Sequence, residues 1–287
     1  MGLGDIARRF VRNRLAVVGA LFLLVVHGVA VLAPWIIPVD PLAVDPIAAL
    51  RGPEPGHPLG TDEFGRDVLS RLAYGGRVSL AVGLLSMAIA LVFGTAVGAA
   101  SGFFGGAVEV LLMRFTDAMM AIPPFFLLLA TLAVLGGTPA AVIVVIGLTS
   151  WMGVARVVRS EYLRWREEAF VESARALGAR DARILTRHVL PQALPSVIVS
   201  ATLGVAFAIL TESAVSFLGF GIAPPTPTWG NMLMNAQQYL WTSPMLAVYP
   251  GLMILLTVLS YNFVGDGLRD ALDPFLRGRF LRGRAGA

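Results

Sequence analysis

Long apolar runs that contain no Asp, Glu or Arg dominate the pattern of this 287-residue chain. A helix that crosses the hydrocarbon core of a bilayer needs about 20 mainly apolar residues. Two of the runs are longer than one such helix and contain their own breaks, at 136–139 and in the glycine- and proline-rich stretch 219–230. The pattern therefore predicts an all-α integral membrane protein with six transmembrane helices, at residues 15–37, 78–101, 109–135, 139–156, 196–219 and 245–264.

The arginines are divided unevenly between the two sides that six spans define. Eighteen of the 22 lie in the terminal segments, near the start of the third span, or between the fourth and fifth spans, and four lie on the opposite side. Because basic residues are in excess in cytoplasmic segments, both termini are predicted to be cytoplasmic. The N-terminal apolar stretch is longer than the core of a signal peptide, and we interpret it as an uncleaved first span.

This topology predicts a cytoplasmic arm at 1–14, a transmembrane domain at 15–264 and a cytoplasmic tail at 265–287. Three connections within the domain are long enough to fold, namely an external segment at 39–77, a cytoplasmic loop at 156–190 and an external loop at 219–244.

Composition agrees with a membrane protein and excludes several kinds of site. Charged residues make up 14% of the chain, whereas a soluble domain carries about 25%. There is no cysteine and every basic residue is arginine, so a P-loop, a Schiff-base lysine and a thiolate metal site are excluded. The three histidines are dispersed, and the net charge is only +4. We therefore expect no metal site, no nucleic-acid partner and no enzymatic chemistry.

The connection between the fourth and fifth spans carries an amphipathic pattern. Phe170, Ala174 and Leu177 recur at i, i+4 and i+7, while Glu172 lies on another face. Gly178 follows the last apolar residue, as the C-terminus of a helix prefers. This spacing predicts a short helix that ends at the glycine.

A second short helix is predicted after that glycine. Asp181 can cap its start, it runs through Val189, and Pro191 stops it. We interpret the loop either as a solvated surface or as a docking element for a cytoplasmic partner. A DNA-binding helix-turn-helix is disfavoured because the membrane holds both ends.

Ionisable and proline residues inside the spans need separate explanations. Glu212 is predicted midway along the fifth span, where it should face a cavity or a partner rather than lipid. Three roles are open for this carboxyl group: contact with a substrate amine, pairing with an arginine of a partner subunit, or a neutral, hydrogen-bonded state that fixes helix packing. We favour the third.

Pro123 and Pro124 should kink the third span. A structural charge cluster is predicted near the start of that span, formed by Glu109, Arg114 and Asp117.

The loop residues also carry a family resemblance. Glu172-Ser173-Ala174, followed by Gly178 and then by Leu190-Pro191, resembles the Glu-Ala-Ala signature of permease subunits of bacterial ABC importers. Ser173 stands where the family has alanine, and His188 stands where isoleucine is usual, as in the peptide-importing branch. In this family the loop inserts into a cleft of the ATP-hydrolysing subunit. The resemblance implies that role for Phe170, Glu172, Ser173, Ala174, Leu177, Gly178, Asp181, His188, Leu190 and Pro191.

Three further blocks resemble the "C"-type permease of dipeptide, oligopeptide and nickel importers. They lie before the second span, in the last external loop and at the C-terminal end, at residues 57–67, 224–230 and 265–274. Together with the loop they cover about residues 57–277 in order. The resemblance implies the type I ABC importer permease fold, in the bacterial cytoplasmic (inner) membrane.

The resemblance also implies partners. These are a homologous permease in a heterodimer, two cytoplasmic ATPases that use ATP and Mg, and an extracytoplasmic binding protein that delivers dipeptides or oligopeptides. This chain itself would bind no cofactor. Three alternatives stay open: a nickel-chelate permease, an ion-coupled secondary transporter in which Glu212 carries protons, and a non-transporting scaffold.

The external segment at 39–77 is too polar for a tight turn, and we interpret it as a folded cap, a landing surface for the binding protein, or both. The alternation of Asp62, Arg66 and Asp67 with Leu69 and Leu72 suggests a helix lying in the membrane interface. The candidate contacts with the binding protein are Asp62, Glu63, Arg66, Asp67 and Trp229.

Overall fold

The computed structural model describes residues 3–272, and the part of the predicted tail at 273–287 lies outside the described residues. The described chain is helical and contains no strand, only two isolated bridges. Its long helices are α2 (Arg14–Ile36), α3 (Val68–Phe104), α4 (Gly106–Ala121), α5 (Pro124–Leu135), α6 (Pro139–Trp165), α9 (Leu190–Phe217) and α11 (Met245–Leu272). The shorter ones are α1 (Leu3–Arg12), η1 (Pro46–Ala48), α7 (Ala169–Ala176), α8 (Asp181–Arg183), η2 (Ile184–Val189), α10 (Trp229–Ala236) and η3 (Gln237–Tyr239).

Five helices within residues 3–272 are long and apolar enough to cross a membrane, and a bent pair makes up to six. The bent pair is α4 and α5, which meet at 77°. Pro123 is the N-cap of α5 and Pro124 its first residue, so neither needs an intrahelical hydrogen-bond partner there. The all-α fold is thus confirmed, and so is the kink predicted from the two prolines.

The helix α3 begins ten residues earlier than the apolar run predicts. The side chain of Asp67 accepts a hydrogen bond from the backbone N–H of Ser70 at 2.7 Å and caps the helix. The predicted interfacial helix is therefore wrong, because residues 62–67 form a loop and Leu69 and Leu72 belong to α3. Hydropathy misses this extension since Arg71 and Arg77 interrupt the apolar run.

A second difference concerns Pro191, which does not stop the helix that precedes it. The segments α8, η2 and α9 follow one another without a break from Asp181 to Phe217. The π-helical geometry of η2 has i→i+5 hydrogen bonds, and the N–H of Leu190 donates to the carbonyl of Leu185. This wider turn places proline at the start of α9, where its missing N–H is tolerated.

The helices α3 and α6 form the centre of the bundle and pack on each other more extensively than any other pair. Three glycines spaced by four residues, Gly94, Gly98 and Gly102, lie on α3 against the backbone of α6. A Cβ at Gly94 would lie 2.7 Å from the carbonyl oxygen of Trp151. Small residues at this spacing allow membrane helices to approach closely.

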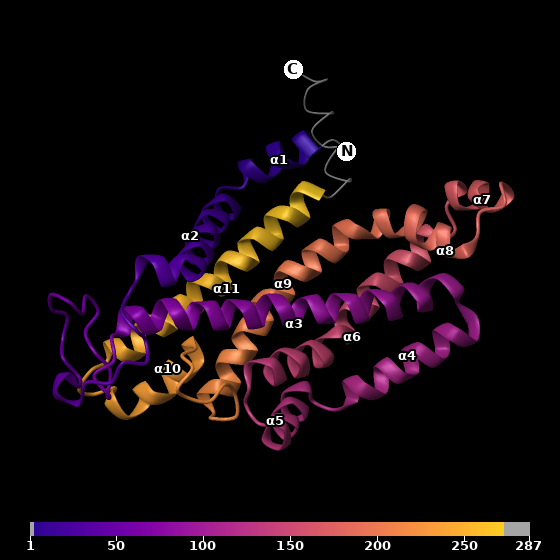
Figure 1. Ribbon diagram of the computed structural model, residues 1–287. Coiled ribbons are helices and arrows are strands. Elements are labelled where there is room, and N and C mark those ends of the chain that lie inside the picture. The colour runs from indigo at the N-terminus through magenta and orange to yellow at the C-terminus, as the bar shows by residue number, and fades with distance from the viewer. Residues whose placement is uncertain (1–2, 273–287) are drawn as a thin grey trace.

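The two ends of the bundle differ in what they carry (Figure 1). The helices α1, α7 and α8 and the C-terminal end of α11 lie toward one end, which we call the arginine-rich end. The segment between α2 and α3 lies with α10 at the opposite end, which we call the α10 end. The placement matches the distribution of arginine in the sequence, and the side of the membrane on which each end lies stays a prediction.

Candidate functional site

The loop between α6 and α9 is held firmly at its base. Val171 and Ala174 of α7 are buried together with Ile184 of η2. The hydroxyl of Tyr162 on α6 donates a hydrogen bond to the carbonyl of Leu185 at 3.1 Å. These contacts join α7 and η2 to α6, so a force applied to α7 reaches α6 and α9 directly.

The tip of this loop exposes an apolar side chain. Leu177 is 88% exposed, and Gly178 has a φ of +78° with no atom near the position of a Cβ. The N–H of Gly178 donates to the carbonyl of Arg175 at 2.9 Å. The predicted end of the helix at Gly178 is confirmed by this left-handed glycine.

The predicted apolar face of α7 is partly wrong. Ala174 is buried, but Phe170 and Leu177 are exposed, and Val171 takes the inward position instead. Buried residues at i and i+3 suffice because α7 has only eight residues and packs mainly on η2. The periodicity therefore marks an exposed stripe at the tip rather than a core face.

The other residues of the signature divide into exposed and half-buried ones. Glu172, Ser173 and Pro191 are exposed, whereas His188 and Leu190 are half-buried. Asp181 lies in the first turn of α8 and makes no capping hydrogen bond, so its predicted capping role is wrong. The N-cap position belongs to Arg180, one residue earlier.

A buried cluster of charges organises the external segment at the α10 end. Asp62 pairs with Nε of Arg66 at 2.7 Å and with Nε of Arg71 at 3.2 Å. Glu63 pairs with Nη2 of Arg66 at 3.1 Å. Desolvation raises the pKa of the Glu63 carboxyl, although Arg66 opposes this shift. Because burial makes an unpaired charge costly, the four side chains hold the loop in one conformation.

Trp229 joins this segment to the bundle. Its side chain is only 1% exposed, and its indole N–H donates to the carbonyl of Leu72 on α3 at 2.9 Å. The preceding residue, Thr228, forms a capping box with Asn231 that starts α10.

Four of the five residues proposed to touch a binding protein are therefore buried, namely Asp62, Arg66, Asp67 and Trp229. Their role as surface contacts is contradicted, and the side chain of Glu63 is itself only 9% exposed in its pair with Arg66. The α10 end instead exposes large apolar side chains at Ile47, Phe64 and Trp241, the last being 99% exposed. Of these, only Phe64 stands out in the sequence, as a single apolar residue among Asp62, Glu63 and Arg66.

Glu212 is buried completely and lies five residues before the end of α9, not midway along it. Its Oε1 accepts a hydrogen bond from Ser216 at 2.8 Å, and its Oε2 accepts one from Ser79 of α3 at 3.1 Å. Ser79 also accepts the backbone N–H of Trp229 at 3.2 Å. No cation of residues 3–272 lies within ion-pair distance of Glu212. The geometry supports a packing role that connects α3, α9 and α10.

We expect Glu212→Gln to leave the amount of assembled protein unchanged, because the amide has the same shape and can still bond Ser216 and Ser79. Glu212→Leu should lower it, since buried hydroxyls lose a partner at about 1–3 kcal/mol each. The measurement is the yield of monodisperse protein after extraction from membranes. Thr211→Val, next to it on α9, serves as the control. Full yield for Glu212→Leu would contradict the packing role, whereas complete loss of folded protein for Glu212→Gln would show that the packing needs the carboxyl group itself.

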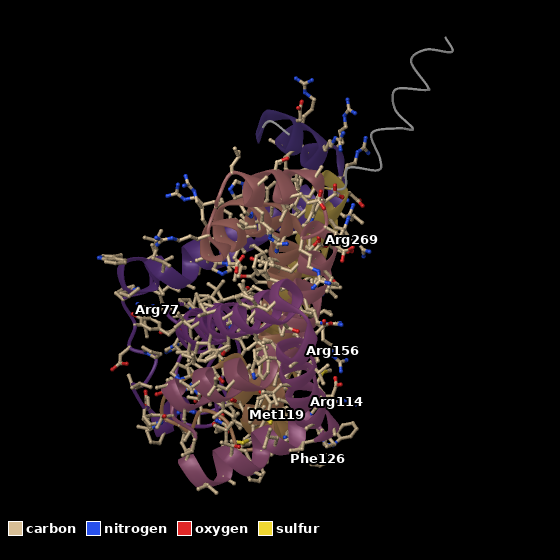
Figure 2. The ribbon with its side chains drawn as sticks, turned by 90° about the vertical axis from the view of Figure 1, so that its right-hand side faces the viewer. Arg77, Arg114, Met119, Phe126, Arg156 and Arg269 are labelled. Carbon is tan, nitrogen blue, oxygen red and sulfur yellow. The ribbon has the colours of Figure 1, made fainter. Side chains whose placement is uncertain are left out.

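The predicted charge cluster on α4 pairs with α6 rather than within itself. Asp117 accepts a hydrogen bond from Arg156 at 2.6 Å, and Glu109 pairs with Arg159. Arg114 is exposed on the same helix (Figure 2). Across the described residues no group of three His, Asp or Glu side chains could hold a metal ion.

Comparisons with known proteins identify the family of the chain. Residues 80–278 match the family described as binding-protein-dependent transport system inner membrane component. Residues 3–53 match the N-terminal transmembrane domain of oligopeptide transport permease C.

Two curated relatives match almost the whole chain. The dipeptide transport system permease protein DppC of Alkalihalophilus pseudofirmus is 39% identical over 266 residues, which are 93% of this chain and 88% of the relative. The glutathione transport system permease protein GsiD of Escherichia coli is 41% identical over 272 residues, which are 94% of this chain and 90% of the relative. Inward-facing structures of the MetNI methionine ABC transporter match 71% of this chain and 97% of theirs with a TM-score of 0.57. At 20% identity that likeness concerns the fold.

Proposed function

The chain belongs to the inner-membrane permease subunits of peptide-type ABC importers, and from this premise we propose that it carries short peptides as one half of a permease heterodimer. Such a permease generally works with ATPase subunits and an extracytoplasmic binding protein. Two cytoplasmic ATPases, one on each permease, complete our proposed assembly. The chain itself is not an enzyme.

The observation that carries the proposal is the exposed tip of the loop between α6 and α9. Leu177 and Gly178 project from a segment that is otherwise anchored by Val171 and Tyr162. A cleft on an ATPase that closes when ATP binds can grip this tip and move α6 and α9 together. Both helices pack on α3, so the motion reaches the centre of the bundle.

The proposed orientation places the arginine-rich end in the cytoplasm. It follows from the positive-inside rule, because most of the arginines lie in segments at that end. The loop that would meet the ATPase and the helix α1 lie at the same end (Figure 1). In this arrangement residues 1–14, 156–190 and 265–287 are cytoplasmic, and the segments at 39–77 and 219–244 face the binding protein. The transmembrane domain at 15–264 lies between them.

Short peptides are the proposed substrate class. Relatives at 39% and 41% identity carry names for dipeptide and glutathione transport, and both names denote short peptides. No specific observation favours a nickel chelate or proton coupling through Glu212, whose carboxyl is buried and bonded to serines.

The test is uptake by proteoliposomes that contain the complete transporter, purified through a tag on this chain. We expect two ATPases and a second permease to co-purify, and a radiolabelled dipeptide to enter only with ATP and the binding protein. Collapse of the proton gradient should leave uptake unchanged. Uptake that persists without the ATPases but stops with the gradient would identify a secondary transporter. Unaltered uptake in cells that lack the chain would identify a scaffold.

A further inference from the structure

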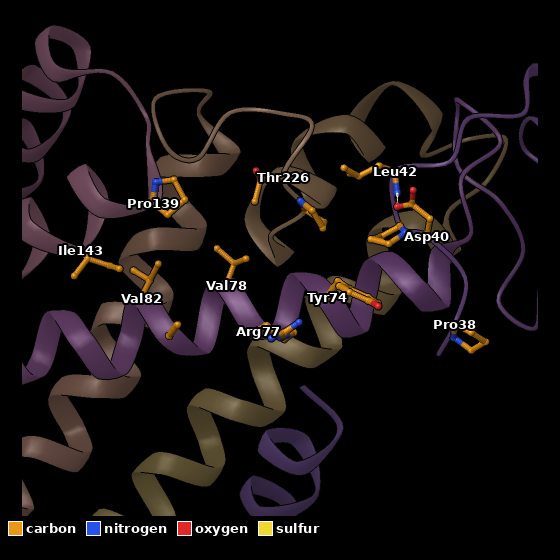
Figure 3. Close-up of a pocket in the computed structure, with 13 residues that line it drawn as sticks. Pro38, Asp40, Leu42, Tyr74, Arg77, Val78, Val82, Pro139, Ile143 and Thr226 are labelled. Atoms are coloured by element: carbon orange, nitrogen blue, oxygen red, sulfur yellow. Dashed lines mark hydrogen bonds between the residues drawn. The ribbon is translucent and has the colours of Figure 1, made fainter. Parts of the chain in front are cut away.

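A groove with a volume of about 770 Å³ opens at the α10 end of the bundle. Its floor is the first half of α3, and its walls come from the segment after α2, the start of α6 and the loop before α10 (Figure 3). Sites for small molecules in proteins have volumes of about 300–1,000 Å³. The groove is therefore large enough for a ligand of a few residues.

One end of the groove carries a cation without an anionic partner. Arg77 is exposed on α3, and its guanidinium lies 5.9 Å from the ring centroid of Tyr74. No carboxylate of residues 3–272 lies within ion-pair distance of it. Arg77 is the last residue of the external segment, just before the apolar run of α3, so its guanidinium is open to water or to a polar ligand.

The groove also carries an anion without an ion-pair partner in the described chain, Asp40 on the segment after α2. Asp40 accepts the backbone N–H of Leu42 on its Oδ1 at 2.8 Å, and its second oxygen has no bond within the described chain. Asp40 and Arg77 line one groove without forming an ion pair with each other. Away from Asp40 the groove becomes apolar, with Val78 next to Arg77 and then Val82 and Ile143 along α3 and α6 (Figure 3).

We propose that this groove is a binding site for short peptides with free termini, in which Arg77 binds the α-carboxylate, Asp40 binds the α-ammonium group and the apolar end receives a side chain. A planar guanidinium matches a carboxylate with two parallel hydrogen bonds. Tyr74 holds the guanidinium by cation–π contact. Opposite charges that do not pair with each other are complementary to a zwitterion, whereas a neutral or singly charged ligand leaves one of them unpaired.

The site deepens the proposed function and rests on it. The groove lies at the α10 end, which faces the binding protein in the proposed orientation, so a peptide released there can reach it. The permease would thus contribute to selection for free peptide termini, in addition to any selection by the binding protein.

The test measures binding to the permease–ATPase complex purified without its binding protein, by equilibrium dialysis. The probes are radiolabelled alanyl-phenylalanine, its N-acetyl form and its C-terminal amide. We expect blocking of either terminus to weaken binding about tenfold or more, the range for loss of a charge-assisted hydrogen bond. Arg77→Gln should weaken binding of the free dipeptide to the level of the amide and leave the amide unaffected. Asp40→Asn should weaken binding of the free dipeptide to the level of the N-acetyl form and leave binding of the N-acetyl form unaffected.

The matched control is Arg51→Gln, another exposed arginine of the external segment, which lies outside the groove and pairs with Glu54. It should bind all three probes as the unaltered complex does. Arg77→Lys keeps the charge but not the planar guanidinium. Its affinity for the free dipeptide should lie between those of the unaltered complex and of Arg77→Gln. Equal binding of all probes by the unaltered complex, or equal weakening of all probes by Arg77→Gln, would overturn the site. Dipeptide uptake by the complete transporter, measured alongside, separates this failure from failure of the proposed function, in which no peptide is carried at all.

Discussion

Replacing Leu177 by Asp is expected to abolish co-purification of the ATPase subunits while the chain remains inserted in the membrane. Leu177 makes almost no contact within this chain, because 88% of its surface is exposed. A charged side chain there does not disturb the fold but cannot enter an apolar cleft. Loss of one central apolar contact in an interface costs about 2 kcal/mol or more, or roughly 30-fold in affinity.

Gly178→Pro should have the same effect through the backbone. The φ of +78° at Gly178 is inaccessible to proline, whose ring fixes φ near −65°, and the N–H donated to Arg175 is lost. Glu172→Lys, which reverses an exposed charge one turn before the tip, should also prevent co-purification.

The matched control is Ser173→Ala, an exposed position on the same helix. It restores the residue usual in the family signature and should leave co-purification unchanged. The measurement is the ratio of ATPase to this chain after tag purification from membranes, with membrane insertion checked separately. Normal recovery of the ATPases with both Leu177→Asp and Gly178→Pro would refute docking at this loop.

The second large effect is expected at the buried charge cluster of the external segment. Asp62→Asn keeps the shape of the side chain but leaves Arg66 and Arg71 without their shared counter-charge. Breaking a buried ion pair by removing one partner costs about 3–5 kcal/mol. The external segment should then open locally, while the helices of the bundle stay folded.

Hydrogen exchange of the backbone N–H groups of Leu50, Thr61 and Asp62, which donate to the carbonyls of Asp62, Arg51 and Arg66, reports this opening. Exchange should become about 100-fold faster or more, as the loss of 3–5 kcal/mol implies. Glu54→Gln is the control, because its pair with Arg51 is exposed and such pairs contribute less than about 1 kcal/mol. Exchange that is equally slow in both variants would show that the cluster does not order the segment.

The sequence predicted the membrane spans well for a physical reason. Hydrocarbon requires an uninterrupted apolar length, and such a length is a local property that can be read without knowing the fold. The kink at Pro123 and the helix end at Gly178 were predicted for a similar reason, since both follow from the backbone of one residue.

The sequence predicted least where charges lie near the ends of spans. The sequence predicts Asp62 and Arg66 as surface contacts, since they belong to a polar external segment and charged side chains are mostly exposed. They are buried because Arg71, on the extended start of α3, completes their pairing, and because Trp229 covers the same helix from α10. Trp229 contacts Leu72 across 157 positions of the chain, a distance at which local patterns carry no information.

The sequence by itself determined the class of protein, the long apolar helices and the loop with the family signature, since apolar length and motif spacing are local. Only the tertiary structure decided which face of each element is available. It buries Val171 and exposes Leu177 on one short helix, and it brings Asp40 and Arg77 to one groove without pairing them. These outcomes depend on which segments meet in space, and that is fixed by packing among helices far apart in the chain.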